Sequence, residues 1–204
     1  MHKRLYCDIE TSGLNPQIHG ITQIAAIVEL DGKVVDSLNL PCLIRPEEKI
    51  EAKALEIQGL FEHEIREGEG RHTARNAHII FTEFMRKYVN PYNKKDKFHF
   101  VGFNSQAFDA VFLNQWFRKN QDNYFYAWFF NPTIDVYVLA GYFMEQVRVD
   151  FPNFQLATVC RRVNLPWEEE EAHDAMYDIT MTRKLFLECE RLLKKKFGNS
   201  QDKV

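Results

Sequence analysis

A hairpin signal near the start of the chain constrains the fold more than any other sequence feature. Asp31-Gly32 separates two runs of strand-like composition, residues 21–30 and 33–45, and this dipeptide between apolar runs is typical of a two-residue β-hairpin loop. An earlier apolar run, residues 4–9, is followed by the turn-rich stretch 11–16. These segments therefore predict a three-stranded antiparallel meander.

Beyond Pro46 the pattern changes to helices and strands in alternation. Apolar residues within 72–89 recur at the spacing of one helix face. The further predicted elements are a polar loop over 90–97, a strand over 98–103, a helix over 106–118, a strand over Tyr126 to Phe130, a helix capped by Thr133 and a last long helix over 172–195. A meander followed by alternation predicts an α/β sandwich with a five-stranded mixed sheet. No repeat or linker divides the chain, so we expect one domain over residues 1–197 and a flexible tail over 198–204.

Composition indicates an ordinary globular protein. The chain has 204 residues, of which 45% are hydrophobic and 27% charged, and this balance argues against intrinsic disorder. The four cysteines (Cys7, Cys42, Cys160 and Cys189) form no C-x-x-C pair, which disfavours a zinc cage or a disulfide framework and predicts free thiols. No apolar run has the length of a signal-peptide core or of a membrane span. We therefore expect a soluble, cytoplasmic protein that does not contact a membrane.

The formal net charge of −3 differs from the strongly basic balance of proteins that hold long duplexes. Either the partner is uncharged, or the protein contacts few phosphates and uses metal ions to do so.

Two acids, Asp8 and Glu10, follow the first apolar run. Residues i and i+2 of a strand point to the same face, and two carboxylates on one face of an apolar strand repel each other unless they share a cation. Oxygen ligands of this kind suit Mg²⁺ or Mn²⁺. A solvated, inert pair at a strand edge is the alternative.

Three further candidates lie later in the chain. Asp109 lies in the first turns of a predicted helix, where the macrodipole alone also favours an acid. His173 and Asp178 lie five residues apart, so a regular helix would separate their directions by about 140°. They reach one pocket only if His173 lies at or before the start of the helix. Asp174 suits the N-cap of that helix or its first turn.

Three blocks in order resemble the DEDDh, or DnaQ-like, exonucleases. The blocks are Asp8-Ile9-Glu10-Thr11-Ser12-Gly13-Leu14, Gly102-Phe103-Asn104-Ser105-Gln106-Ala107-Phe108-Asp109 and His173-Asp174-Ala175-Met176-Tyr177-Asp178. They are similar to the family patterns D-x-E-T-T-G-L, h-N-x-x-F-D and H-x-A-x-x-D. The resemblance covers residues 4–190 and implies an RNase H-like three-layer sandwich, a five-stranded mixed sheet flanked by helices.

The resemblance also implies a catalytic set. Asp8, Glu10 and Asp178 would hold two divalent cations, Mg²⁺ or Mn²⁺, and Asp109 would bind one of them directly or through water. His173 would take the proton from the attacking water, a task that suits an imidazole near neutral pH.

Substrate contacts are implied for the same blocks. Thr11 and Ser12 would meet the terminal ribose and its 3′-OH. Leu14 and Phe103 would pack on terminal bases, with simple core packing as the alternative, and Asn104 belongs to the same substrate-binding set. Gln58 stands where many members have histidine, which puts contacts of that segment in question. Lys94, Lys95, Lys97, Arg161 and Arg162 are candidates for contacts with the nucleic-acid backbone further along, although a solvated surface explains the lysines better.

The implied function is a metal-dependent 3′→5′ exonuclease that releases nucleoside 5′-monophosphates, with single-stranded DNA as the favoured substrate. An enzyme for RNA or oligoribonucleotides has the same site and is the first alternative. The second is a non-catalytic nucleic-acid-binding module, such as a replication accessory subunit. A two-carboxylate glycosidase would leave His173 unexplained. The sequence does not identify a polymerase or other replication partner.

Overall fold

The computed structural model describes residues 2–198 of the chain. A mixed sheet of six strands forms its centre, in the order β4-β3-β2-β1-β5-β6. The strands are β1 (Lys3–Thr11), β2 (Ile21–Leu30), β3 (Lys33–Leu43), β4 (His72–Thr73), β5 (His99–Gly102) and β6 (Ile134–Asp135). The first three strands are antiparallel, whereas β5 runs parallel to β1 and β6 parallel to β5. The predicted mixed α/β sheet is confirmed, with one strand more than the five expected.

The hairpin predicted at Asp31-Gly32 joins β2 to β3. Asp31 has a φ of 48° and Gly32 a φ of 82°, and two successive residues with positive φ are what a type I′ turn requires. The pairing places Leu30 opposite Lys33. The second and third strands of the meander are therefore joined by the turn that the sequence predicts.

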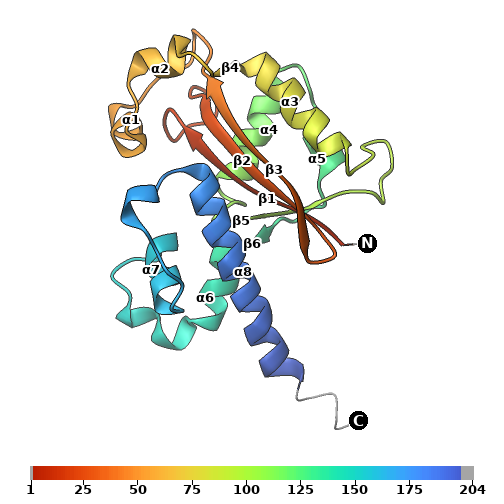
Figure 1. Cartoon of the computed structure of the whole chain (residues 1–204), viewed down its shortest axis with the longest axis vertical. Helices are drawn as coiled ribbons and strands as arrows, with labels where there is room; N and C mark the ends of the chain where they lie inside the picture. Colours follow the sequence, from red (N-terminus) through yellow and green to blue (C-terminus); the bar gives the residue numbers. More distant parts are fainter. Residues whose placement is uncertain (1, 199–204) are drawn as a thin grey trace.

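Helices cover both faces of the sheet (Figure 1). One face carries α3 (Ala74–Arg86), α4 (Asp109–Lys119) and α5 (Phe125–Trp128), and the other carries α6 (Val136–Phe143), α7 (Leu156–Arg162) and α8 (Ala175–Gly198). Successive side chains of β1 alternate between them: Leu5, Cys7 and Ile9 enter the first core, whereas Tyr6 enters the second. Asp8 and Glu10 share the parity of Tyr6, so they lie on the side of α8.

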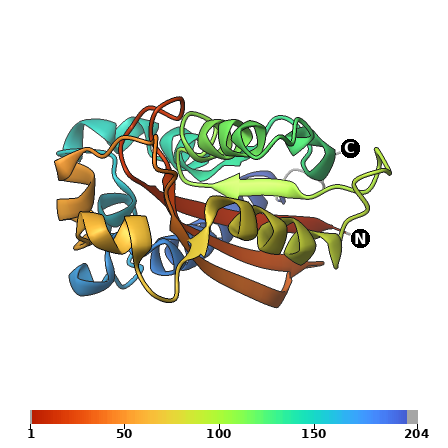
Figure 2. The ribbon, with the colours of Figure 1, turned by 90° about the horizontal axis from the view of Figure 1, so that it is seen from above.

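The remaining helices lie at the edges of the sandwich. Two short helices, α1 (Ala52–Gln58) and α2 (Glu62–Glu67), lie together at one end of the sheet, and the loop between α3 and β5 extends at the opposite end (Figure 2). Two 3₁₀ turns, η1 (Glu145–Asp150) and η2 (Glu169–Glu171), lead into the segments before α7 and α8.

A buried carboxylate fastens α8 to the sheet. Glu29, which is 1% exposed, accepts hydrogen bonds from Arg4 of β1 at 2.9 Å and from Arg183 of α8 at 2.7 Å. A buried charge is tolerated only when such partners satisfy it. This contact fixes the position of α8 relative to β1, the two elements that carry most of the candidate site.

Two local predictions were wrong. Residues Tyr126 to Phe130 do not form a strand, because α5 occupies most of this segment and only Phe129 makes an isolated bridge, to Phe98. Thr133 is not the cap of α6, because Asp135 caps it by accepting the backbone N–H of Tyr137 at 3.0 Å.

Three smaller expectations have structural outcomes. All four cysteines are free and buried. No helix within the described residues has an apolar stretch long enough to cross a membrane. Of the expected tail, Gly198 ends α8, and residues 199–204 lie outside the described part of the chain.

Candidate active site

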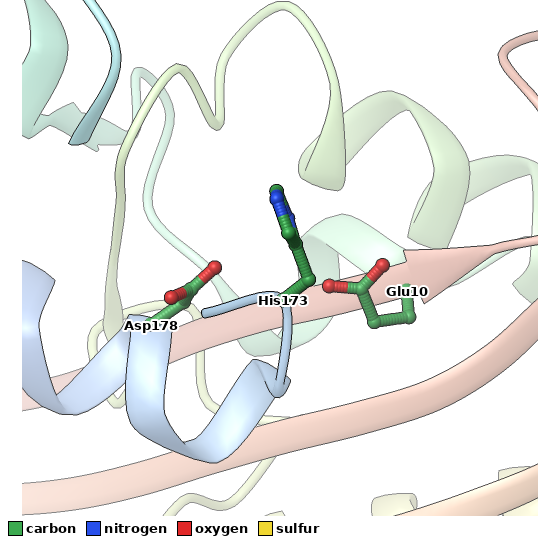
Figure 3. Close-up of side chains that lie close together, drawn as sticks. All are labelled: Glu10, His173 and Asp178. Atoms are coloured by element: carbon green, nitrogen blue, oxygen red, sulfur yellow. The ribbon is translucent and has the colours of Figure 1, made fainter. Parts of the chain in front are cut away.

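Glu10, His173 and Asp178 form the centre of the candidate site. One ligand atom from each lies within 4.8 Å of the others. Glu10 comes from the end of β1, Asp178 from the first turn of α8 and His173 from the segment just before that helix, and their side chains face a common space (Figure 3). The structure thus brings together three residues that are up to 168 positions apart in the sequence.

His173 lies before the start of α8, as it must if it is to reach the same pocket as Asp178. The helix begins at Ala175, so His173 precedes it, and a φ of 66° turns the backbone at this residue. Asp174 then caps α8, since its Oδ1 accepts the backbone N–H groups of Met176 at 2.9 Å and Tyr177 at 3.0 Å. The turn allows the exposed imidazole to face Asp178 despite the five-residue separation.

Asp109 is the first residue of α4. Its Oδ1 accepts the backbone N–H of Ile9 at 3.1 Å, and the side chain is 3% exposed. The short strand β5 pairs with β1 only from Arg4 to Tyr6. Beyond that pairing the edge of β1 is open, and Asp109 accepts its hydrogen bond there.

Burial and mutual repulsion raise the pKa values of the acids. For Asp8 the pKa is well above its ordinary value, first because of burial and then because of the negative charges of Asp109, Glu10 and Asp178. Burial, followed by the charge of Asp178, raises the pKa of Glu10 to about 8. Burial also raises the pKa of Asp109 to about 7 and that of Asp178 to about 6. Without a cation, the cluster therefore strongly disfavours its ionised form.

Two residues that the sequence did not single out as site residues position the site. Gln23 of β2 lies opposite Glu10, and its Nε2 donates to Asp174 Oδ2 at 3.1 Å. Asp135 accepts the backbone N–H groups of Asn104 at 2.9 Å and Gln106 at 3.1 Å, which fixes the loop before Asp109. Gln23 lies in no motif, and Asp135 lies outside the three blocks that resemble the family patterns.

The predicted substrate contacts fall into two groups. Thr11 and Ser12 are buried and turn their hydroxyls inward: Thr11 donates to the carbonyl of Gly13 at 2.8 Å, and Ser12 donates to that of Lys49 at 2.7 Å. Leu14 is 74% exposed, Phe103 is half-buried and Asn104 is exposed with a φ of 60°. Only the second group presents side chains to a ligand, and the first shapes the turn after β1.

Gln58 is held by protein groups on both ends of its amide. Its Nε2 donates to the carbonyl of Thr11 at 2.8 Å, and its Oε1 accepts from Thr22 at 2.7 Å. Beside it lies a cavity of about 350 Å³, whose lining includes Gln58, Arg71 and His173. Gln58 therefore supports the turn after β1 at the wall of a cavity that adjoins the site.

Three of the five basic residues predicted to contact the nucleic-acid backbone interact with groups of the protein itself. Lys97 donates to the carbonyl of Tyr126 at 2.5 Å, whereas Lys94 and Lys95 are exposed on the loop before β5. Arg161 pairs with Glu169, and Arg162 lies 4.0 Å from Asp150.

Comparison with known proteins assigns the chain to a family. The sequence model of RNase_T, described as an exonuclease, matches residues 5–186. The chain belongs to the RNase_T exonuclease family. The resemblance of the three blocks to the DEDDh exonucleases agrees with this assignment, and the expected family is confirmed.

Relatives of the chain include proteins of very different length. Over 189 residues it is 28% identical to the PolC-type DNA polymerase III of Thermotoga petrophila, a match that covers 92% of this chain and 12% of that protein. Over 202 residues it is 28% identical to Ribonuclease T of Yersinia enterocolitica, covering 94% of this chain and 86% of that protein. The chain thus spans about an eighth of the polymerase relatives that it matches.

A solved structure shares the fold. E. coli Exonuclease I in complex with a dT13 oligonucleotide superposes with a TM-score of 0.73 at 19% identity, over 99% of this chain and 43% of that protein. This likeness confirms the RNase H-like architecture expected for the chain.

Proposed function

We propose that the protein is a metal-dependent 3′→5′ exonuclease that releases nucleoside 5′-monophosphates from single-stranded DNA. The observation that carries the proposal is the convergence of Glu10, His173 and Asp178 within 4.8 Å of one another, at the end of a strand that also bears Asp8. Membership of an exonuclease family supports the same reaction class.

The acids present suit divalent cations. Asp178 Oδ1 is buried without a hydrogen-bond partner, and a buried polar atom of this kind calls for an additional partner. The pKa values of Asp8, Glu10 and Asp178 are all raised, a cost that a shared cation removes. Asp8, Glu10 and Asp178, with Asp109 directly or through water, would hold two cations, and their oxygen ligands favour Mg²⁺ or Mn²⁺.

Such cations, when bound, lower the pKa of water and stabilise the negative charge on the leaving oxygen. His173 acts as the general base: its exposed imidazole faces the space beside Glu10 and Asp178 and takes the proton from the attacking water. The water oxygen forms a bond to phosphorus while the bond from phosphorus to the 3′ oxygen breaks. The released nucleotide therefore keeps its 5′ phosphate.

The 3′ polarity is assigned to the turn after β1. Thr11 and Ser12 fix the shape of this turn through their inward hydrogen bonds, so its backbone groups are the parts available to the terminal ribose. The exposed Leu14 and the half-buried Phe103 offer apolar contacts for terminal bases. The exposed Asn104 offers a polar contact.

A single strand suits the charge of the protein. With a formal net charge of −3, the chain lacks the broad positive field that holds long duplexes. The structural relative Exonuclease I was solved with a dT13 oligonucleotide, which supports a single-stranded DNA end as the substrate.

RNA is the second candidate substrate. Ribonuclease T of Yersinia enterocolitica is matched over 86% of its length. The same catalytic set, Asp8, Glu10, Asp109, His173 and Asp178, would hydrolyse either a DNA or an RNA backbone. A contact with the 2′-OH would distinguish the two. A non-catalytic accessory role remains the alternative of another class, and it predicts no cleavage with any divalent cation.

The test is a digestion series. Oligonucleotides labelled at the 5′ end, as single-stranded DNA, duplex DNA and RNA of the same sequence, are incubated with Mg²⁺, Mn²⁺ or EDTA. A ladder that shortens one nucleotide at a time on single-stranded DNA, only when a divalent cation is present, supports the proposal. A faster ladder on RNA selects the second candidate, and no ladder on any substrate rejects both.

A further inference from the structure

A row of aromatic rings leads away from the candidate site. The ring of Phe103, which directly follows β5, meets that of Tyr137 at a centroid distance of 5.4 Å. Tyr137 meets Phe154 at 5.3 Å, and Phe154 meets Phe151 at 5.4 Å. The row therefore starts beside the loop that carries Asn104 and continues across the first turn of α6 to the segment before α7.

Arginines cover the outer end of this row. The guanidinium of Arg148 lies 4.7 Å from the ring centre of Phe154 and 6.0 Å from that of Phe151. Arg162 lies 5.8 Å from the same Phe151 ring. A guanidinium stacked on a ring is held in place while its N–H groups remain available to a phosphate.

Among these cations, Arg148 alone retains an uncompensated charge. Arg161 pairs with Glu169, and Arg162 approaches Asp150 at 4.0 Å. No carboxylate within the described part of the chain pairs with Arg148, whose side chain is exposed. An exposed, oriented cation thus lies at the outer end of the aromatic row, in a protein whose overall charge is negative.

Exposure separates supporting rings from contact rings. Phe151 is 9% exposed and Phe154 7%, so both serve as the base on which Arg148 rests. Tyr137 is 37% exposed and the neighbouring Val138 63%. The accessible surface of the row is therefore an aromatic edge near the site, followed by a positive charge further out.

We infer that the nucleic-acid strand upstream of the scissile bond runs over this row, with a base on Tyr137 and a phosphate on Arg148. Stacking on aromatic rings combined with cations along the backbone is how single strands are held without regard to sequence. Successive steps of 4.7 to 5.4 Å connect Phe103 to Arg148, so a strand of a few nucleotides spans the row. The inference rests on the proposed function, because it takes the 3′ end to lie at Glu10, His173 and Asp178.

Salt dependence of binding tests the phosphate contact. A 12-nucleotide oligothymidylate with a 5′ fluorophore is titrated with protein in EDTA, where no cleavage occurs, at several salt concentrations. Each phosphate contact to a single strand contributes about −0.7 to the slope of log affinity against log salt. Arg148→Gln is expected to make the slope shallower by about 0.7. The matched control Arg75→Gln removes an equally exposed charge from α3, on the opposite face of the sheet, and is expected to keep the wild-type slope.

A second pair of variants tests the stacking contact. Tyr137→Leu removes the ring and is expected to weaken binding of the 12-mer about tenfold, whereas Tyr137→Phe keeps the ring and restores affinity. Thermal melting of each variant verifies folding, and if Tyr137→Leu does not fold, the slope of Arg148→Gln decides alone.

The outcomes separate the inference from the function on which it rests. Cleavage of the same 12-mer by the wild type with Mg²⁺ or Mn²⁺, together with a shallower slope only for Arg148→Gln, supports the path. Cleavage with equal slopes for Arg148→Gln and Arg75→Gln overturns the path and leaves the function standing. No cleavage by the wild type with either cation overturns both.

Discussion

Asp8 lies among four other carboxylates near the end of β1. Its pKa is raised first by burial and then by Asp109, Glu10, Asp178 and Asp174. An acid in this position opposes folding of the metal-free protein, because the ionised form is poorly hydrated and lies beside other negative charges. Its presence is understandable if a cation binds there.

Replacing Asp8 separates stability from activity. Asp8→Asn is expected to lower the cleavage rate by more than about 100-fold, since even supporting partners of metal ligands account for changes of this size. The melting temperature of the metal-free variant should equal or exceed that of the wild type. Melting curves in EDTA and initial rates with Mg²⁺ measure both effects. An active variant, or one that melts well below the wild type, would contradict the role given to Asp8.

His173 provides a second prediction at this scale. His173→Gln keeps a polar side chain but removes the base, so the rate is expected to fall by about 10²–10⁴-fold. The dissociation constant for the oligonucleotide in EDTA should change little, because the exposed His173 is assigned to proton transfer and not to substrate binding. Single-turnover rates and binding titrations distinguish this result from a binding defect, in which affinity would fall with the rate.

Among the elements, the start of α8 determines the geometry of the site. Asp174 caps this helix and also accepts the hydrogen bond from Gln23 of β2. The cap thus connects the helix that carries Asp178 to the strand next to Glu10, and it fixes the turn that carries His173.

Removing the cap should loosen this connection. Asp174→Ala is expected to cost about 1 kcal/mol of stability, which lowers the melting temperature by about 2–4 °C in a protein of this size. The cleavage rate should fall as well, since His173 loses its fixed position. Asp174→Asn is the matched control, because asparagine caps helices as well as aspartate does. Equal melting temperatures for the Ala and Asn variants would show that the cap contributes little.

Element prediction from sequence succeeded where the local signal was strong. β2 has the predicted bounds and the Asp31-Gly32 turn forms, whereas α8 begins at Ala175, three residues after the predicted start. The strands β4 and β6 have two residues each, too few to show a period. The aromatic segment 126–130 has strand composition, but tertiary packing of Phe125 and Trp128 in the core favours a helical turn.

The candidate site was predictable to the extent that its residues fall in motifs. The converging Glu10, His173 and Asp178 lie in blocks that the sequence displays. The positioning roles of Gln23 and Asp135 depend on which strands become neighbours and on where loops close, and no pattern along the chain reports that.

At the scale of the whole molecule, the carboxylate cluster links stability to pH. The folded-state pKa values are about 8 for Glu10 and about 7 for Asp109, whereas unfolded carboxyl groups titrate near pH 4. Between these values the folded protein holds more protons than the unfolded chain. Its free energy of unfolding therefore falls as the pH rises.

The expected result is a metal-free protein that melts at a lower temperature at pH 8.5 than at pH 6.5. Burial lowers the pKa values of His78 and His99, so these imidazoles contribute a slope of the opposite sign near the lower end of this range, and that contribution is the same in the wild type and in Glu10→Gln. Mg²⁺ should raise the melting temperature most at pH 8.5, because it binds the ionised cluster. Calorimetric scans of the wild type and of Glu10→Gln measure the effect. An identical pH dependence in both proteins would show that Glu10 is not responsible.

The contact between Asp109 and the backbone of Ile9 joins positions one hundred residues apart, and Asp178 arrives later still. During synthesis, a ribosome-bound fragment therefore holds Asp8 and Glu10 long before their partners exist. Any chemistry that needs the assembled cluster is withheld until nearly the whole domain has emerged and closed around β1.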